Sequence, residues 1–145
     1  MEETINTIVQ AVVFIYLIFE GITDYRYKSV AVKPIILFGF LEILCGFFVL
    51  HMEPVAMLLG AVPGACMMLF SKGTGGVIGM GDGAVICVAG ILSGALGILM
   101  VILLGGFLAA MVSAFLLVLR RVRLKQEIPF LPFVAAGYLG VMLCV

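Results

Sequence analysis

The sequence predicts an all-α polytopic membrane protein, and three observations lead to this fold class. First, 65% of the 145 residues are hydrophobic and 11% are charged, whereas a soluble domain carries about 25% charged residues. Second, several long segments contain no charged residue, namely 4–19, 54–71, 83–119 and 128–145. Third, all eight Lys and Arg residues fall in three short stretches between apolar segments. This composition excludes a soluble enzyme, and zero net charge without a long basic tract argues against a nucleic-acid-binding protein.

The lengths of the apolar segments predict the number of helices. A transmembrane helix needs about 20 apolar residues. The segment 83–119 would form a straight helix of about 55 Å, which exceeds the hydrocarbon core of about 30 Å. We therefore divide it near Ser93–Gly97. The sequence then predicts six transmembrane helices in a single domain covering 1–145, over residues 5–22, 34–50, 54–71, 82–94, 97–119 and 129–145.

The positions of the cations support this division. They are Arg26, Lys28, Lys33, Lys72, Arg120, Arg121, Arg123 and Lys125. With six helices all of them lie on one side, as expected for short cytoplasmic loops, where the last four also suit contact with anionic lipid. Both termini are then extracytoplasmic. A five-helix alternative would place Lys72 opposite Arg120–Lys125. Because the first segment begins Met-Glu-Glu, we expect a permanent helix rather than a cleaved signal peptide.

The cysteines give no sign of a metal site or a disulfide framework. The chain has four, and no two of them form a C-x-x-C pair. Such widely spaced cysteines in apolar helices are usually small hydrophobic residues. We therefore expect no structural metal.

Two acidic residues at the membrane boundary suggest chemistry on water. Asp24 ends the first predicted helix and Asp82 opens the fourth, so both lie at the cytoplasmic face in the six-helix topology. Two aspartates that share a site cannot both ionise easily, so one keeps a proton. The ionised one can activate a water, and the protonated one can polarise a carbonyl. This is aspartic peptidase chemistry. An alternative remains open, in which Asp82 only caps its helix and Asp24 pairs with Arg26.

The motifs around these aspartates form a longer pattern. Gly79-Met80-Gly81-Asp82 is a G-x-G-D sequence at the start of a membrane helix, within a glycine-rich stretch at 73–81. Asp24 is followed by Arg26 and Lys28, and residues 128–137 read I-P-F-L-P-F-V-A-A-G. In this order, and over essentially the whole chain, these elements resemble the prepilin peptidases, or type IV leader peptidases. Presenilin-like peptidases share G-x-G-D but place their second aspartate late in a longer helix set.

The resemblance implies a fold, a site and a substrate. It implies six helices in the inner (cytoplasmic) membrane, an active site at the cytoplasmic face, and catalysis by Asp24 and Asp82. It also implies an active-site loop of Gly79, Met80, Gly81 and Gly83. The implied substrate is a type IV prepilin or pseudopilin whose short basic leader ends in glycine. No metal or organic cofactor is implied, and the chain resembles a short form without the family's N-terminal methylation-associated domain.

The sequence departs from the family pattern at three places. Where the family usually has Ile-Pro-Asn after the first aspartate, this chain has Val30-Ala31-Val32. Ala84 replaces a lysine two residues after the second aspartate, and Leu131 replaces the glycine of I-P-F-G-P. We expect these departures to affect substrate positioning more than carboxylate chemistry.

Several further residues have more than one possible role. Glu20 lies one turn before Asp24, where it either tunes that carboxyl and receives a basic leader or snorkels to the interface. Glu42 lies in the middle of the second helix, and its simplest interpretation is a protonated acid bonded to a neighbouring helix. His51 is expected to be solvated in an outer loop. Pro129 suits the first turn of the last helix, and residues that could position substrate are Glu20, Arg26, Lys28, Pro129 and Pro132.

The sequence is also compatible with a second class of function. Acids inside membranes often mark ion paths, so Asp24 and Asp82 could belong to a small ion- or proton-coupled transport or assembly protein. Such acids are expected near the midplane with access from both faces. Depth therefore discriminates between the two functions.

Overall fold

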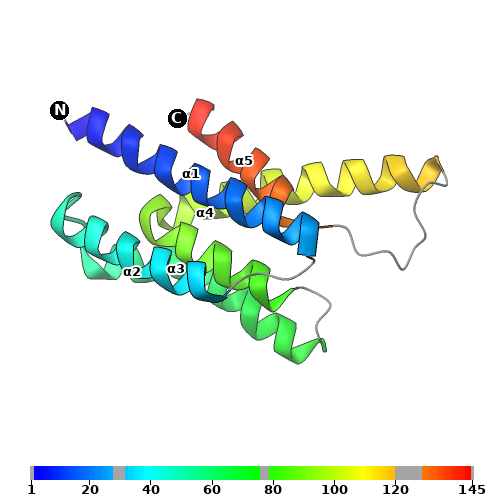
Figure 1. Cartoon of the computed structure of the whole chain (residues 1–145), viewed down its shortest axis with the longest axis horizontal. Coiled ribbons are helices and arrows are strands. Elements are labelled where there is room, and N and C mark those ends of the chain that lie inside the picture. The colour runs from blue at the N-terminus through cyan, green and yellow to red at the C-terminus, as the bar shows by residue number, and fades with distance from the viewer. Residues whose placement is uncertain (1, 28–31, 76–78, 120–128, 145) are drawn as a thin grey trace.

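The structure is a computed structural model that describes residues 2–27, 32–75, 79–119 and 129–144. It contains five helices and, in these ranges, no strand: α1 (Glu2–Tyr27), α2 (Val32–Phe48), α3 (Pro54–Gly73), α4 (Met80–Val118) and α5 (Leu131–Cys144) (Figure 1). The predicted all-α class is confirmed.

The helices have the dimensions and the surface of a membrane protein. Three of those described are long and apolar enough to cross a membrane, over Glu3–Tyr27, Pro54–Gly73 and Met80–Val118. Large hydrophobic side chains point outward along the helices, such as Phe40 on α2 and Leu103 on α4, which are 60% and 72% exposed. A soluble protein rarely exposes such continuous apolar surface, and lipid is its natural solvent.

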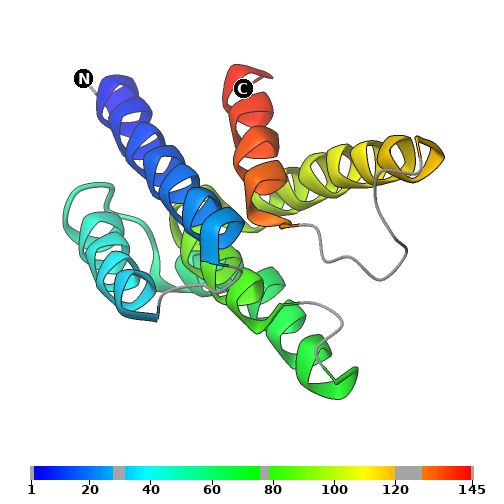
Figure 2. The ribbon, with the colours of Figure 1, turned by 45° about the vertical axis from the view of Figure 1, so that its right-hand side comes forward.

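The long helix α4 is broken where the sequence predicts a division. Gly94 has φ 71° and ψ 167°, a non-helical conformation inside the 39-residue span. Only glycine adopts this region readily, because it has no Cβ. The first half of α4 runs toward the end of the molecule that holds both chain termini, and the second half runs back (Figure 1). The second half leans away from α3 (Figure 2).

Several predicted helix boundaries differ from the structure by two or three residues, and the end of the first helix differs by five. The first helix continues past residue 22 to Tyr27, since no proline stops it and the Thr23 hydroxyl bonds back to the Phe19 carbonyl within the helix. The last helix begins at Leu131 rather than at Pro129. Pro132, not Pro129, therefore occupies its first turn, where a missing N–H costs nothing.

Glycines bring α3 and the first half of α4 into backbone contact. A side chain at Gly60 would collide with the Gly90 carbonyl, and one at Gly64 would collide with the Cys87 backbone. Without a hydrophobic force between helices in lipid, such close packing of small residues is the main source of helix association. α3 and the first half of α4 are therefore the most closely packed helix pair among the described residues.

Glycines also join the second half of α4 to α5. A Cβ at Gly105 would lie 2.9 Å from the Phe133 carbonyl, and one at Gly137 would lie 2.8 Å from the Val101 carbonyl. Gly94 and Gly106 have open space around them, and a Cβ at Gly97 would meet only Ser93, in its own helix. Of the four glycines at 94, 97, 105 and 106, only Gly105 has a Cβ position that lies against another helix.

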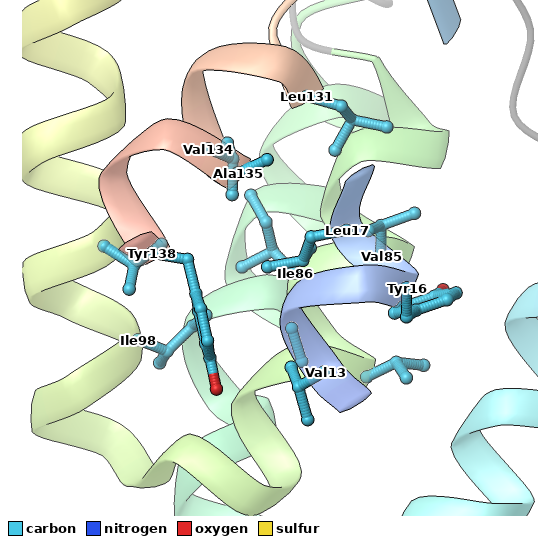
Figure 3. Packing of buried hydrophobic residues seen from close by; sticks show 13 residues of the cluster. Val13, Tyr16, Leu17, Val85, Ile86, Ile98, Leu131, Val134, Ala135 and Tyr138 are labelled. Carbon is cyan, nitrogen blue, oxygen red and sulfur yellow. The ribbon is translucent and has the colours of Figure 1, made fainter. Parts of the chain in front are cut away.

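The apolar core lies where α1 and α5 meet the two halves of α4. Its members include Leu17 on α1, Ile86 and Ile98 on α4, and Leu131 and Val134 on α5, each fully buried. Figure 3 shows these side chains interdigitated around the start of α5. Leu131 thus fills the core.

The helix ends separate into two groups. The chain termini, the α2–α3 turn and the bend in α4 lie toward one end of the molecule. The ends of α1, α3 and α4 and the starts of α2, α4 and α5 lie toward the other (Figure 1). The described cations are Arg26, Lys33 and Lys72, all within a turn of this second group of ends. Lys28 and Arg120–Lys125 lie outside the described residues.

Candidate active site

Asp24 is held at the start of another helix. Its side chain is 9% exposed, and its carboxylate accepts a hydrogen bond from the backbone N–H of Leu131, the first residue of α5. The first N–H groups of a helix have no partner within it, and the helix dipole favours a negative charge there. Asp24 therefore binds the N-terminus of α5 from a different helix.

A glycine makes this approach possible. A Cβ at Gly21, almost one turn before Asp24, would lie 3.3 Å from the Pro132 nitrogen. α1 and the start of α5 are consequently in close contact at the depth of the carboxylate. The structure places Pro132 against α1 at Gly21. Pro129 is half-buried and precedes the helix.

Asp82 lies in the first turn of its own helix. The N-cap of α4 is Gly79, which puts Asp82 at the third helical position. The side chain folds back, since a Cβ at Gly79 would lie 3.0 Å from a carboxylate oxygen. The first glycine of G-x-G-D therefore leaves space for the carboxylate. Asp82 is partly exposed, so water and a substrate can reach it.

The other members of the predicted loop have different surroundings. Met80 is 49% exposed, and Gly81 is half-buried. Gly83 is buried against α3, where a Cβ would lie 2.7 Å from Cγ of Met68 and 3.0 Å from its backbone nitrogen. Gly83 therefore packs α4 against α3.

The fold brings the two aspartates to the same end of the molecule. The charge of Asp24 acts on Asp82, so the carboxyls are within electrostatic reach although they come from different helices. The open alternative fails on both counts in the described residues. Asp82 is not the N-cap of α4, and Arg26 is exposed and does not act on Asp24. The Asp24–Leu131 bond is a structural role that the local sequence did not indicate.

Two deeper acids are buried in the bundle. Glu20 is fully buried and Glu42 is 4% exposed. Their four carboxyl oxygens have no hydrogen-bond partner among the described residues. The snorkelling interpretation of Glu20 is therefore wrong, and so is the bond from Glu42 to a neighbouring helix. His51 is exposed in the α2–α3 turn, as expected.

Tyr16 is the polar residue that sequence reasoning missed. It is 1% exposed, its hydroxyl has no hydrogen-bond partner in the described part of the chain, and Glu20 and Glu42 both act on it electrostatically. The available signal was the spacing of four between Tyr16, Glu20 and Asp24, which places all three on one face of a helix.

The functional side chains of the candidate site are carboxyl groups. No group of three His, Cys, Asp or Glu side chains within the described ranges is arranged to hold a metal ion. The four cysteines are free thiols. Comparison of the chain with protein-family models, curated proteins and solved structures finds no match.

Proposed function

We propose that this protein is a membrane aspartic endopeptidase of the prepilin peptidase type, which it resembles in its motifs. One observation carries the proposal: Asp24 and Asp82, from different helices, lie within electrostatic reach at one end of the bundle. The substrate implied by the resemblance is a type IV prepilin or pseudopilin, cleaved after its short basic leader at the cytoplasmic membrane surface.

The two carboxyls would divide the reaction between them. The ionised aspartate takes a proton from a water as the water oxygen attacks the scissile carbonyl, while the protonated one donates a hydrogen bond to the carbonyl oxygen. The tetrahedral intermediate then collapses as a carboxyl proton passes to the leaving amine. The Leu131 N–H holds the Asp24 carboxylate in place during these steps. The water needs access, which the partial exposure of Asp82 provides.

The proposal includes a topology of six spans in the inner membrane, with both termini extracytoplasmic. The break at Gly94 and the grouping of helix ends support it. Cysteines introduced at His51, Lys72 and Arg123 in a cysteine-free variant test it. An impermeant thiol reagent added from outside should label the cysteine at 51 and leave those at 72 and 123 unlabelled. Labelling at 123 with protection at 72 would contradict the topology.

A direct cleavage assay tests the activity. Purified protein in detergent is incubated with a prepilin, and the product is examined for a leader-sized mobility shift and for its new N-terminus by mass spectrometry. The matched control is the same prepilin with the last leader glycine replaced by a bulky residue, which should not be cut. Failure to cut several prepilins in lipid as well as detergent would overturn the proposal.

A proton-coupled transport protein is the second candidate, and the buried acids Glu20 and Glu42 favour it. Their depth inside α1 and α2 fits an ion path better than the boundary position of Asp24 and Asp82 does. Vesicles that contain the protein and an internal pH dye distinguish the two functions. Acidification that depends on Glu42 would favour transport, whereas a tight membrane together with prepilin cleavage would favour the peptidase.

A further inference from the structure

Three polar side chains gather where α1 faces α2, one or more helical turns from Asp24. Tyr16 stacks on Phe38 of α2 with ring centroids 4.3 Å apart and an interplanar angle of 18°. Figure 3 shows its hydroxyl pointing out of the aliphatic cluster toward α2. Glu20 follows Tyr16 by one turn on α1, and Glu42 follows Phe38 by one turn on α2. Both carboxyls act electrostatically on the Tyr16 hydroxyl.

These three side chains are enclosed and unsatisfied. They are between 0% and 4% exposed. Their five oxygen atoms have no hydrogen-bond partner among the residues that the structure describes. A buried polar group without a partner destabilises the fold, so water or an ion commonly fills such a site.

The groups that face this site offer no positive charge. Asp24, one turn further along α1, acts on Glu20. Cys45 of α2 and Tyr138 of α5 lie within reach of Glu42. No Lys, Arg or His appears among these neighbours in the described ranges. A lone ionised carboxyl in this setting would be costly, since an isolated charge loses its hydration inside a membrane.

Protons and water together remove the cost of the isolated charge and the cost of the unpartnered polar atoms. A proton on each carboxyl abolishes the charge, and water can accept from the acid O–H and from the Tyr16 hydroxyl. A metal ion suits the site less well, since the described residues contain no group of three acidic, His or Cys ligands around one point. The chemistry therefore selects protons as the ligand.

We propose that Tyr16, Glu20 and Glu42 form a hydrated proton-binding site inside the membrane, in which Glu20 and Glu42 carry exchangeable protons at neutral pH. The site stands apart from the peptidase proposal, because it concerns groups one or more turns from the aspartates and can be tested without substrate. It also gives α1 a row of polar side chains at a spacing of four, Tyr16, Glu20 and Asp24.

Dicyclohexylcarbodiimide, an apolar carbodiimide, tests the proposal on the full-length protein in phosphatidylcholine vesicles. The probe reacts with a protonated carboxyl: the acid proton moves to one nitrogen, the carboxyl oxygen bonds to the central carbon, and the acyl group then shifts to nitrogen. The product is an N-acylurea that keeps every atom of both reactants. Peptide mass spectrometry locates the adduct, and fragmentation separates Glu20 from Asp24.

We expect adducts on Glu20 and Glu42 at neutral pH and none on Glu53. Glu53 is the matched control, because it is exposed in the α2–α3 turn and lies outside the buried site. Well above the titration range of the site, each further pH unit should reduce labelling by about tenfold, as for any single proton site. E20Q and E42Q should each lose only their own adduct.

Two results would overturn the inference. Protection of Glu20 and Glu42 by sodium or potassium at constant pH would identify a cation site instead. Absence of adducts is resolved by infrared spectra of wild type, E20Q and E42Q in D2O. If neither variant loses a protonated-carboxyl band, the carboxyls are ionised and the proposal is wrong. If a variant loses the protonated-carboxyl band although the wild type forms no adduct, the protons are present and the carbodiimide does not reach the carboxyls.

Discussion

The α3–α4 interface and the α1–α2 interface are built in opposite ways. Between α3 and the first half of α4 the backbones touch through Gly60, Gly64 and Gly90. In the described part of this interface no buried side-chain polar atom lacks a partner. Between α1 and α2, the large rings of Tyr16 and Phe38 meet, and five buried oxygens lack a partner.

The difference separates a tightly packed structural region, α3 with the first half of α4, from a polar functional region between α1 and α2. Close glycine contacts fix the helix that carries Asp82, and a substitution there meets backbone rather than a flexible side chain. Polar groups that are buried without partners cost stability in a membrane and are kept for a chemical reason. Four experiments, in order of expected effect, test this division.

The largest effect is expected at the aspartates. Asp24→Asn and Asp82→Asn should each lower the prepilin cleavage rate by at least about 10²–10⁴-fold, the usual contribution of a group that transfers protons. In the Asp24→Asn variant the side-chain amide oxygen still accepts from the Leu131 N–H, so the thermal stability should stay near that of wild type. Cleavage kinetics and circular dichroism measure the two quantities. Near wild-type cleavage by either variant would refute the dyad.

The next largest effect is expected at the glycine contacts between α3 and α4. Gly64→Leu places a side chain against the Cys87 backbone and should destabilise the fold by about 3 kcal/mol, the upper range for overpacked cores. Gly106→Ala is the control, since nothing lies within 4 Å of its Cβ position. It should raise stability by up to about 1 kcal/mol through helix propensity. Thermal unfolding in detergent measures both, and equal effects would show that the close contact is absent.

A smaller effect is expected at the bend of α4. Gly94→Ala forces a side chain into a backbone conformation with φ 71° and should cost about 1–3 kcal/mol. Gly97→Ala is the control, because its nearest neighbour would be the Ser93 Cβ at 3.6 Å. Unfolding of the two variants should differ by that amount. If Gly94→Ala leaves the stability unchanged, α4 can cross the membrane without the break at this residue.

The smallest effect concerns the bond between Asp24 and α5. Asp24→Ala removes the acceptor for the Leu131 N–H and should cost about 0.5–2 kcal/mol, as at other helix N-termini. Asp24→Asn keeps an acceptor and should not. The faster hydrogen exchange of the Leu131 amide in the Asp24→Ala variant alone would report the lost bond. Equal exchange in both variants would leave Asp24 with no role in docking α5.

Composition and charge patterning determined the class of this protein and the general position of its aspartates. Long apolar segments lead to helices in any membrane, because backbone groups in lipid must bond within their own segment. A 37-residue apolar stretch is too long for one crossing, so a break was expected and Gly94 provides it. The one-sided cations predicted that Asp24 and Asp82 share an end, which the grouping of helix ends reproduces.

Only the tertiary structure decided which helix faces touch. In a soluble helix an apolar stripe marks the core, but here lipid-facing and buried positions are both apolar, so hydrophobic periodicity carries little information. The sequence therefore could not choose Gly105 over Gly106 as a packing site, or show that Glu20 is enclosed rather than at the interface. The Asp24–Leu131 bond joins residues at opposite ends of the chain. Such a contact depends on how α1 and α5 pack, which no local pattern in either helix specifies.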